Sequence, residues 1–223
     1  MKSNLILGGV LSLGLIISAP VLAAEKWYVG LGLGSAGYED NAEKNLDSMW
    51  TYHESNLESL GIAEIEQKPS GVFNIYAGQW LTDSQGFEFG YLGVNSVESD
   101  GTTESWNYAV RYDLDGSTDV FYAAALLASK FENKSRLYAK LGFYHATTTE
   151  KVKISGRDTG IQIYSNSENN SNLGFLLGFG YNYEINEKFG FRANYDYFPS
   201  ALDGDLYEGN ISALTLSLNY KLD

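Results

Sequence analysis

The C-terminal stretch of the chain, from Asn210 to Leu222, alternates large apolar and small polar residues one by one. In an extended strand successive side chains point to opposite faces, so the apolar members of this stretch share one face. They are Leu214, Leu216, Leu218, Tyr220 and Leu222. The same alternation recurs upstream with glycines and single charges on the second face. This pattern indicates a membrane barrel that is apolar outside and polar inside.

The N-terminus has the three parts of a secretory signal peptide. Lys2 is followed by an apolar run from Leu5 to Ile17 and then by small residues around Ala23. The run contains 13 residues, whereas a membrane-spanning helix needs about 20. We therefore predict that residues 1–23 are a cleaved signal peptide. Residues 24–223 then form one barrel domain without a transmembrane helix, because no linker or long apolar run follows.

The composition excludes several classes of function. The chain has 28 acidic and 15 basic residues, a formal net charge of -13, and no cysteine. An acidic surface disfavours nucleic acid, because phosphates need basic partners. Without cysteine there is no disulfide and no thiolate metal site. We expect neither a metal nor a cofactor: the segment from Gly32 to Gly37 matches the dinucleotide-binding fingerprint, but no helical pattern follows it.

Eight segments have the pattern of a strand, and their connections alternate between short and long. They lie near Lys26–Tyr38, Gly71–Leu81, Gly86–Ser96, Ser117–Phe131, Ser135–Lys153, Gly160–Glu184, Lys188–Phe198 and Gly209–Leu222. The short connections have turn chemistry. Long loops are predicted from Glu39 to Ser70, from Val97 to Gly116 and from Ala201 to Glu208, with a hairpin tip from Ser155 to Asp158. Short turns at one end and longer loops at the other are typical of outer-membrane barrels.

A soluble antiparallel sandwich is the alternative, and the residues opposite the apolar face separate the two architectures. A sandwich would expose bulky charged side chains there, but this chain places glycine. The glycines are Gly30, Gly32, Gly34, Gly90, Gly142, Gly174, Gly178, Gly180 and Gly190. Glycine suits the crowded interior of a small barrel. The apolar rows, which include Phe87, Phe89, Leu141, Phe143 and Phe175, are then a lipid-facing band.

The predicted loop from Glu39 to Ser70 has a pattern of its own. Leu46, Met49, Trp50 and His53 recur at helical spacing, which favours a short amphipathic helix over the barrel mouth. The many acidic residues of the same segment favour an irregular loop instead, and both interpretations stay open.

Three charges interrupt the glycine face in the middle of strands: Glu88, Lys140 and Arg192. An isolated charge inside a narrow barrel is unfavourable, so these side chains are expected to pair. We predict an interior ion cluster in which Glu88 bridges Lys140 and Arg192. Its simplest role is structural, and a gated ion path is the alternative.

The chain resembles the OmpA-like transmembrane domain, within the outer-membrane β-barrel superfamily of Gram-negative bacteria. The resemblance covers the whole mature chain. It is carried by Trp27-Tyr28-Val29-Gly30, Gly86-Phe87-Glu88-Phe89-Gly90-Tyr91, Tyr138-Ala139-Lys140-Leu141-Gly142, Arg192 and Leu214-Thr215-Leu216-Ser217-Leu218-Asn219-Tyr220. It implies a salt-bridge network inside the barrel, formed here by Glu88, Lys140 and Arg192. A second interior acid of the family pattern is expected to be replaced near Asn182, which weakens an ion-gate mechanism.

No enzyme activity and no catalytic residue are expected. His53 and His145 are the two histidines. A lipid-cleaving site would need a nucleophile and a carboxylate beside His145. Thr147 and Glu150 are near in the sequence, but threonine is an uncommon nucleophile. His145 fits better as a residue of the aromatic belt at the membrane boundary.

The sequence thus predicts a monomeric, all-β, eight-stranded antiparallel transmembrane up-and-down barrel in the outer membrane of a Gram-negative bacterium. An eight-stranded barrel is just wide enough for its own side chains, so porin activity is not expected. The predicted role is structural or surface-interacting, with a narrow solute channel and then a lipid-modifying enzyme as alternatives. The expected partners are outer-membrane lipids, lipopolysaccharide and an extracellular or host ligand of the loops.

Overall fold

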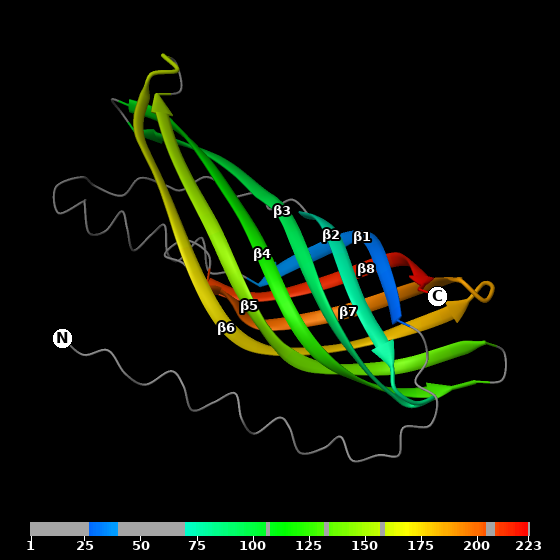
Figure 1. Cartoon of the computed structure of the whole chain (residues 1–223). Helices are drawn as coiled ribbons and strands as arrows, with labels where there is room; N and C mark the ends of the chain where they lie inside the picture. Colours follow the sequence, from blue (N-terminus) through cyan, green and yellow to red (C-terminus); the bar gives the residue numbers. More distant parts are fainter. Residues whose placement is uncertain are drawn as a thin grey trace, which may run out of the picture.

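The computed structural model describes residues 27–39, 70–105, 108–131, 134–156, 159–203 and 208–222. These residues form eight strands (Figure 1). The strands are β1 (Trp27–Glu39), β2 (Ser70–Trp80), β3 (Gln85–Ser105), β4 (Tyr108–Lys130), β5 (Ser135–Gly156), β6 (Gln162–Glu184), β7 (Phe189–Asp203) and β8 (Glu208–Lys221). Within the described ranges, no helix has the length and hydropathy needed to cross a membrane.

The eight strands close into one barrel. Each strand pairs antiparallel with the next, and β1 also pairs with β8. At this closing seam Gly32 lies opposite Ser217, and the backbone N–H of Leu222 donates to the carbonyl oxygen of Trp27 at 2.6 Å. The predicted eight-stranded up-and-down barrel is confirmed.

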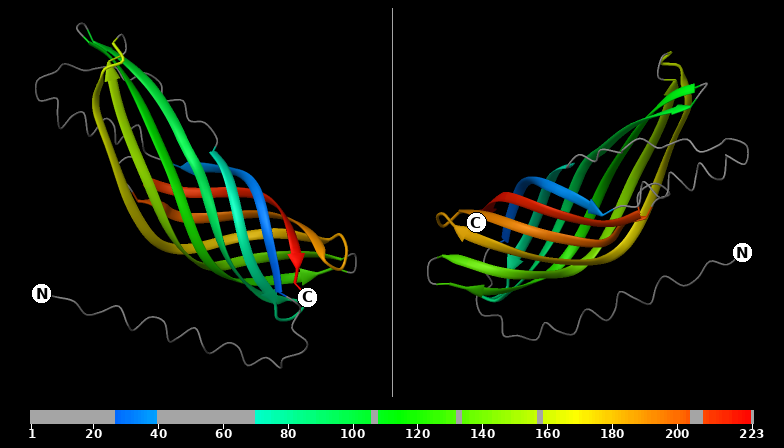
Figure 2. Two further views of the ribbon diagram at one scale, coloured as in Figure 1. Left: turned by 45° about the horizontal axis from the view of Figure 1, so that its top comes forward. Right: turned by 180° about the vertical axis from the view of Figure 1, so that it is seen from behind.

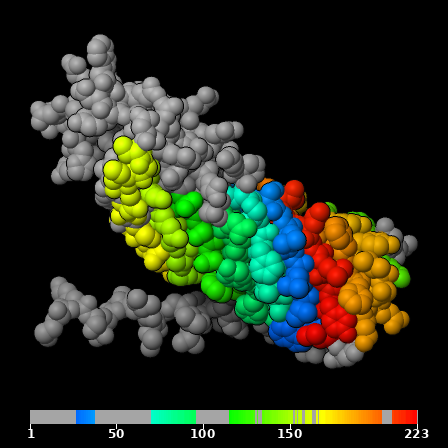
Figure 3. Space-filling view, turned by 90° about the horizontal axis from the view of Figure 1, so that it is seen from above, coloured from blue at the N-terminus to red at the C-terminus, as the bar shows by residue number. Residues whose placement is uncertain are grey.

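Alternate residues of each strand face outward and inward, as the period of two requires. The outward rows are apolar and solvent-exposed in the isolated chain: Leu173 is 76% exposed, Leu33 70% and Leu214 54%. In Figure 3 the wall is seen from outside, with β2, β1, β8 and β7 following one another as adjacent coloured bands. An apolar outer wall around an interior that holds the glycines and the buried charges is the arrangement of a transmembrane barrel, so the predicted orientation of the two faces is confirmed.

Glycine occupies the inner wall where neighbouring backbones approach closely. A Cβ atom on Gly142 would overlap the carbonyl oxygen of Ala123, and one on Gly34 would overlap that of Leu214. Both obstacles are backbone atoms of the adjacent strand, which cannot rotate away. The glycine face of the sequence therefore reflects the narrow bore of the barrel.

The short connections and both described chain ends lie at one end of the barrel. In the first turn the hydroxyl of Thr82 accepts from the backbone N–H of Ser84 at 3.2 Å and of Gln85 at 3.0 Å. In the last, the side-chain oxygen of Asn186 accepts from the N–H of Lys188 at 2.9 Å and of Phe189 at 2.8 Å. Because short turns are periplasmic in outer-membrane barrels, the opposite end is extracellular.

The prediction of a loop from Val97 to Gly116 is wrong. In the structure β3 continues to Ser105 and β4 starts at Tyr108, with Val97 opposite Gly116 and Ser105 opposite Tyr108. The alternation of Tyr108, Val110, Tyr112 and Leu114 with polar residues is a strand pattern, and acidic residues in the same segment obscured it. The expected loop after Ala201 is shorter too, since β7 reaches Asp203.

The barrel is taller on one side. Strands β3 to β6 have 21 to 23 residues, whereas β1, β2, β7 and β8 have 11 to 15. The long strands project beyond the others at the extracellular end, as the two views of Figure 2 show. We call this projection the extracellular blade. It consists of residues 97–105, 108–116, 150–156 and 162–168.

A bulge in β7 directs apolar side chains into the extracellular half of the barrel. Pairing of β7 with β8 shifts register between Phe198 and Leu202, and Ser200 has a φ of 53°. The hydroxyl of Tyr144 donates to the carbonyl oxygen of Pro199. The N–H of Ser200 donates to the side-chain oxygen of Asn210 at 2.8 Å. These contacts hold the bulge in place, so that Phe198, Ala201 and Leu202 are all buried.

Two expectations lie outside the described residues. They are the cleaved signal peptide over residues 1–23 and the choice between a helix and an irregular loop for the segment from Glu39 to Ser70, nearly all of which is outside the described ranges. Both stay predictions.

Candidate functional site

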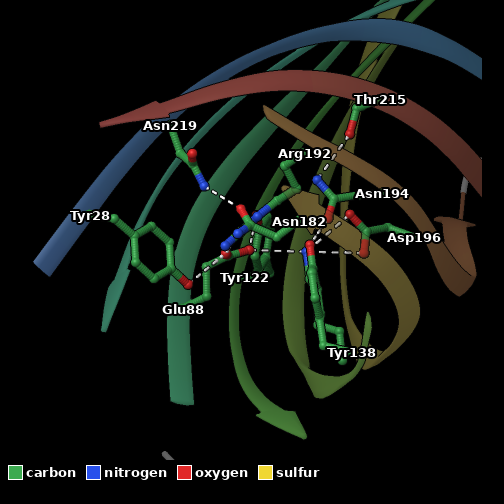
Figure 4. A network of polar contacts seen from close by, with 11 residues as sticks. Tyr28, Glu88, Tyr122, Tyr138, Asn182, Arg192, Asn194, Asp196, Thr215 and Asn219 are labelled. Atoms are coloured by element: carbon green, nitrogen blue, oxygen red, sulfur yellow. Dashed lines mark hydrogen bonds and ion pairs between the residues drawn. The ribbon is translucent and has the colours of Figure 1, made fainter. Parts of the chain in front are cut away.

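The three predicted interior charges lie together in the middle of the barrel, although they come from three different strands. Glu88 on β3 is the common partner: its Oε1 is 3.0 Å from Nζ of Lys140 on β5, and its Oε2 pairs with Nη1 of Arg192 on β7. Each of the three side chains is fully shielded from solvent. Figure 4 shows Glu88 and Arg192 directed toward one another across the lumen.

A fourth charge, Asp196 on β7, belongs to the cluster. The Nζ of Lys140 lies 3.1 Å from Oδ1 and 3.2 Å from Oδ2 of Asp196. The expectation that the second interior acid is lost near Asn182 is therefore corrected: Asn182 accepts a hydrogen bond from Asn219 at 2.7 Å, and Asp196 supplies the second acid. The sequence contains the signal, because Asp196 has the parity of Arg192 and lies between outward Tyr195 and Tyr197.

The cluster is electrically balanced, with two carboxylates and two cations. A buried charge is tolerated when it is paired and its remaining polar atoms are hydrogen-bonded. Glu88 meets this condition, because Tyr28 donates to its Oε2 and Tyr122 donates to its Oε1, both at 3.1 Å. The carboxylate of Glu88 thus has four partners from four strands.

Aromatic rings surround the two cations. The guanidinium carbon of Arg192 lies 4.7 Å from the ring centroids of Tyr28 and Tyr76 and 5.1 Å from that of Tyr138. The Nζ of Lys140 lies 4.9 Å from the ring of Tyr122. The negative faces of the rings stabilise cations, so the tyrosines replace part of the hydration that burial removes.

Polar and aromatic side chains close the periplasmic side of the cluster. Tyr138 donates to the side-chain oxygen of Asn194. The guanidinium of Arg136 lies 4.1 Å from the ring centroid of Trp80, which packs edge to face on Tyr138. Nearer the rim, Lys221 pairs with Glu184 at 2.8 Å. The lumen is therefore filled with side chains between the cluster and the periplasm.

An apolar plug fills the extracellular half of the lumen. Its members come from all eight strands, and each is at most 6% exposed. They are Ala36, Val72, Leu92, Val94, Val120, Tyr122, Ala124, Tyr144, Ala146, Leu176, Phe198, Ala201, Leu202, Ile211 and Ala213. The sequence did not predict this plug, because it depends on which inward residues the barrel stacks together and on the bulge of β7.

The residues considered for a catalytic site do not converge. His145 is exposed on the outward face, opposite Phe121 and Leu173. Glu150 is buried on the inward face of the same strand, so its carboxylate cannot orient His145. Asp119 is the outward carboxylate opposite Thr147, and its Oδ1 accepts from the hydroxyl of Tyr91 at 2.5 Å. Among the described residues, no group of three or more acidic or histidine side chains could hold a metal.

Three solved structures are similar to this chain along most of its length. The Neisserial surface protein A is 11% identical with a TM-score of 0.50, over 90% of this chain and 100% of that protein. The attachment invasion locus protein Ail of Yersinia pestis is 14% identical with a TM-score of 0.48, over 89% and 99%. The outer membrane protein OprG of Pseudomonas aeruginosa is 10% identical with a TM-score of 0.48, over 89% and 96%.

At 11% identity, the similarity to the Neisserial surface protein A shows the fold alone. A search of curated proteins found no match. The model of the outer membrane protein beta-barrel domain family matches residues 9–221, almost the whole chain. This match confirms the resemblance to outer-membrane barrels and the location in the outer membrane of a Gram-negative bacterium. The chain belongs to the outer membrane protein beta-barrel domain family.

Proposed function

We propose that this outer-membrane barrel is a non-conducting anchor that presents the extracellular blade for surface interactions. The observation that carries the proposal is the apolar plug, in which Leu92, Val120 and Phe198 have no exposed surface. An ion that crosses the lumen would have to leave water and enter this apolar region, which is strongly unfavourable. The proposal therefore assigns function to the outside of the barrel and to the blade.

The buried ion cluster then has a structural role. Its charges pair with one another, and protein side chains cover both of its sides. Pairs of this kind connect β3, β5 and β7 across the lumen and favour one arrangement of the strands. A narrow solute channel is the alternative role, and it requires the plug to open.

Planar-bilayer recording separates these two roles. The purified full chain, folded into bilayers, is expected to give no discrete conductance steps. The control is a large porin inserted under the same conditions. Discrete steps that Lys140→Ala alters would contradict the proposal and support the channel, because Lys140 is a buried charge inside the lumen.

Shortening the blade tests the surface role. Ser99 lies opposite Leu114, and Glu98 lies opposite Asp115. Replacing residues 99–114 by an Asn-Gly turn would therefore shorten the β3–β4 hairpin without changing the register below it. Cells that express this variant are expected to lose binding to host cells or to neighbouring bacteria. The barrel should still fold, as heat-modifiable migration on gels would show. Unchanged binding would contradict a role for the blade.

A lipid-modifying activity is the third candidate. It predicts an altered mass of lipid A or phospholipid on expression, and His145→Ala should abolish that change. We expect no such change in mass, because Asp119, the outward carboxylate opposite Thr147, already accepts a hydrogen bond from Tyr91.

A further inference from the structure

Four residues form one row across the inner wall, and three of them carry buried polar atoms that find no partner in the described part of the chain. Asn74 on β2 lies opposite Gly32 on β1, which lies opposite Ser217 on β8. Ser217 in turn lies opposite Arg192 on β7. Asn74, Ser217 and Arg192 are each at most 3% exposed. The unpartnered atoms are Oδ1 and Nδ2 of Asn74, Oγ of Ser217, and Nε and Nη2 of Arg192.

The hydroxyl of Tyr76 joins this group at the glycines of β1. A Cβ atom on Gly32 would overlap Oγ of Ser217, and one on Gly30 would overlap the ring and hydroxyl of Tyr76. Gly30 and Gly32 are alternate residues on one face of the strand, about 7 Å apart. The guanidinium carbon of Arg192 lies 4.7 Å from the centre of the Tyr76 ring. The Tyr76 hydroxyl is also buried and unpartnered among the described residues, so all these polar atoms gather at one place on the inner wall.

Arg192 presents the fork of its guanidinium to this group. Its Nη1 pairs with Glu88, whereas Nε and Nη2 are the two unpartnered nitrogens. Nε and Nη2 lie side by side on one edge of the guanidinium plane. This edge donates two parallel hydrogen bonds, and for that reason arginine is favoured where proteins bind anions.

The order of charges in the ion cluster also favours an anion beside Arg192. Lys140 contacts both carboxylates, those of Glu88 and Asp196, whereas the described ion pair of Arg192 is with Glu88. The chain of contacts therefore ends on a cation. A negative ligand at this end lies next to the positive charge and far from Asp196.

The unpartnered atoms of this group are mostly donors. Five of them carry hydrogen: Nδ2 of Asn74, the hydroxyl oxygens of Tyr76 and Ser217, and Nε and Nη2 of Arg192. Oδ1 of Asn74 is the acceptor that cannot donate. A buried water molecule has two hydrogens of its own to place, whereas an anion only accepts. The set therefore matches an anion better than water.

We propose that Asn74, Tyr76, Arg192 and Ser217 bind one chloride ion inside the barrel, between the ion cluster and the apolar plug. The plug begins at this level, because its member Leu92 lies opposite Asn74. The ion accepts hydrogen bonds from β2, β7 and β8 and so joins these strands across β1, where the barrel closes. The site lies on one side of the plug, so the proposal requires no conduction and does not depend on the surface-interaction role above.

Equilibrium unfolding of the full chain in lipid vesicles with urea tests the proposal. A ligand that binds only the folded state raises its stability as the ligand concentration rises. Chloride replaces gluconate at constant ionic strength, because gluconate is too bulky to take the place of a single ion. Between about 10 mM and about 100 mM chloride, the folding equilibrium constant of the native chain should rise by up to about 10-fold for one site.

The variant Tyr76→Phe/Ser217→Ala removes two donors that have no partner among the described residues. Two lost hydrogen bonds to an ion should weaken its binding by about 100-fold or more, so the rise with chloride should be lost. The matched control is Tyr195→Phe/Ser212→Ala, which makes the same two substitutions where the hydroxyls bond to each other at 3.2 Å. The control should keep the full dependence on chloride.

A crystal grown with bromide in place of chloride gives a direct test. The anomalous signal of bromide should show a peak within hydrogen-bond distance of Nε and Nη2 of Arg192 and Oγ of Ser217. This measurement uses the native chain, so it decides the question even if Tyr76→Phe/Ser217→Ala does not fold.

Three results would overturn the proposal. Stability of the native chain that does not change with chloride would exclude a bound anion. Equal responses of the two double variants to chloride would show that the ion acts elsewhere. Water density without an anomalous peak beside Arg192 would assign the polar atoms to buried water.

Discussion

Lys140 and Asp196 form a fully buried ion pair, with Nζ of Lys140 3.1 Å from Oδ1 of Asp196. The same Nζ is 3.0 Å from Oε1 of Glu88. Lys140 therefore links the two carboxylates of the cluster, and Glu88 links the two cations. This chain of contacts, from Asp196 through Lys140 and Glu88 to Arg192, predicts how the barrel responds when one charge is removed.

Asp196→Ala should lower the free energy of unfolding by about 3 kcal/mol, because it leaves a buried cation with one carboxylate in place of two. Urea unfolding of the folded barrel in lipid vesicles would measure the change. Asp115→Ala, at an exposed outward position, is the control and should change stability by less than about 0.5 kcal/mol. The double variant Lys140→Met/Asp196→Leu should recover much of the loss, because it removes the unpaired charge. Equal stability of Asp196→Ala and the native chain would refute the role of the pair.

Glu88→Ala should be more destabilising than Asp196→Ala. It removes the carboxylate that pairs with both Lys140 and Arg192 and accepts from two tyrosines. Breaking a buried pair costs about 3–5 kcal/mol, so a loss of several kcal/mol is expected in the same unfolding measurement. A loss smaller than that of Asp196→Ala would contradict the central position of Glu88.

Gly142→Ala should destabilise the barrel by about 1–3 kcal/mol, because the added methyl overlaps the backbone of Ala123 and Ala124 and the strands must move apart. Gly37→Ala is the matched control, since no atom lies within 4 Å of a Cβ at that position. Unfolding in vesicles would again give both values. If the two variants lost the same stability, close approach of the strands would not explain the interior glycine.

Leu177→Arg tests the orientation of the faces. Leu177 lies on the outward face of β6 within the apolar band and is 49% exposed, so arginine there should cost about 2–4 kcal/mol in a bilayer. Ser165→Arg, on the outward face of the same strand but above the boundary, should be nearly neutral. In urea without lipid both variants are unfolded, so the position of the arginine should make no difference there. Equal effects in the bilayer would place the membrane boundary elsewhere.

Alternation along the sequence predicted the faces of the strands, their number and their order. The period of two is a local property of extended backbone, so parity alone separates outward Phe175 and Leu177 from inward Gly174 and Gly178. Parity also assigned Glu88, Lys140 and Arg192 to the interior. The same rule applied to Tyr195 and Tyr197 would have placed Asp196 beside them.

Which inward residues meet inside the lumen depends on how the closed barrel aligns its strands. Closure of the barrel brings the charged residues of β3, β5 and β7 to the same height in the lumen. This height depends on the register of every strand pair. The register of the strands brings Asp196 into contact with Lys140, whereas Asn182 accepts a hydrogen bond from Asn219 nearer the periplasm. The bulge at Ser200 and the pairing of Val97 with Gly116 likewise depend on contacts between strands, which no local pattern contains. The interior is therefore specified by register, and the two faces are specified by alternation.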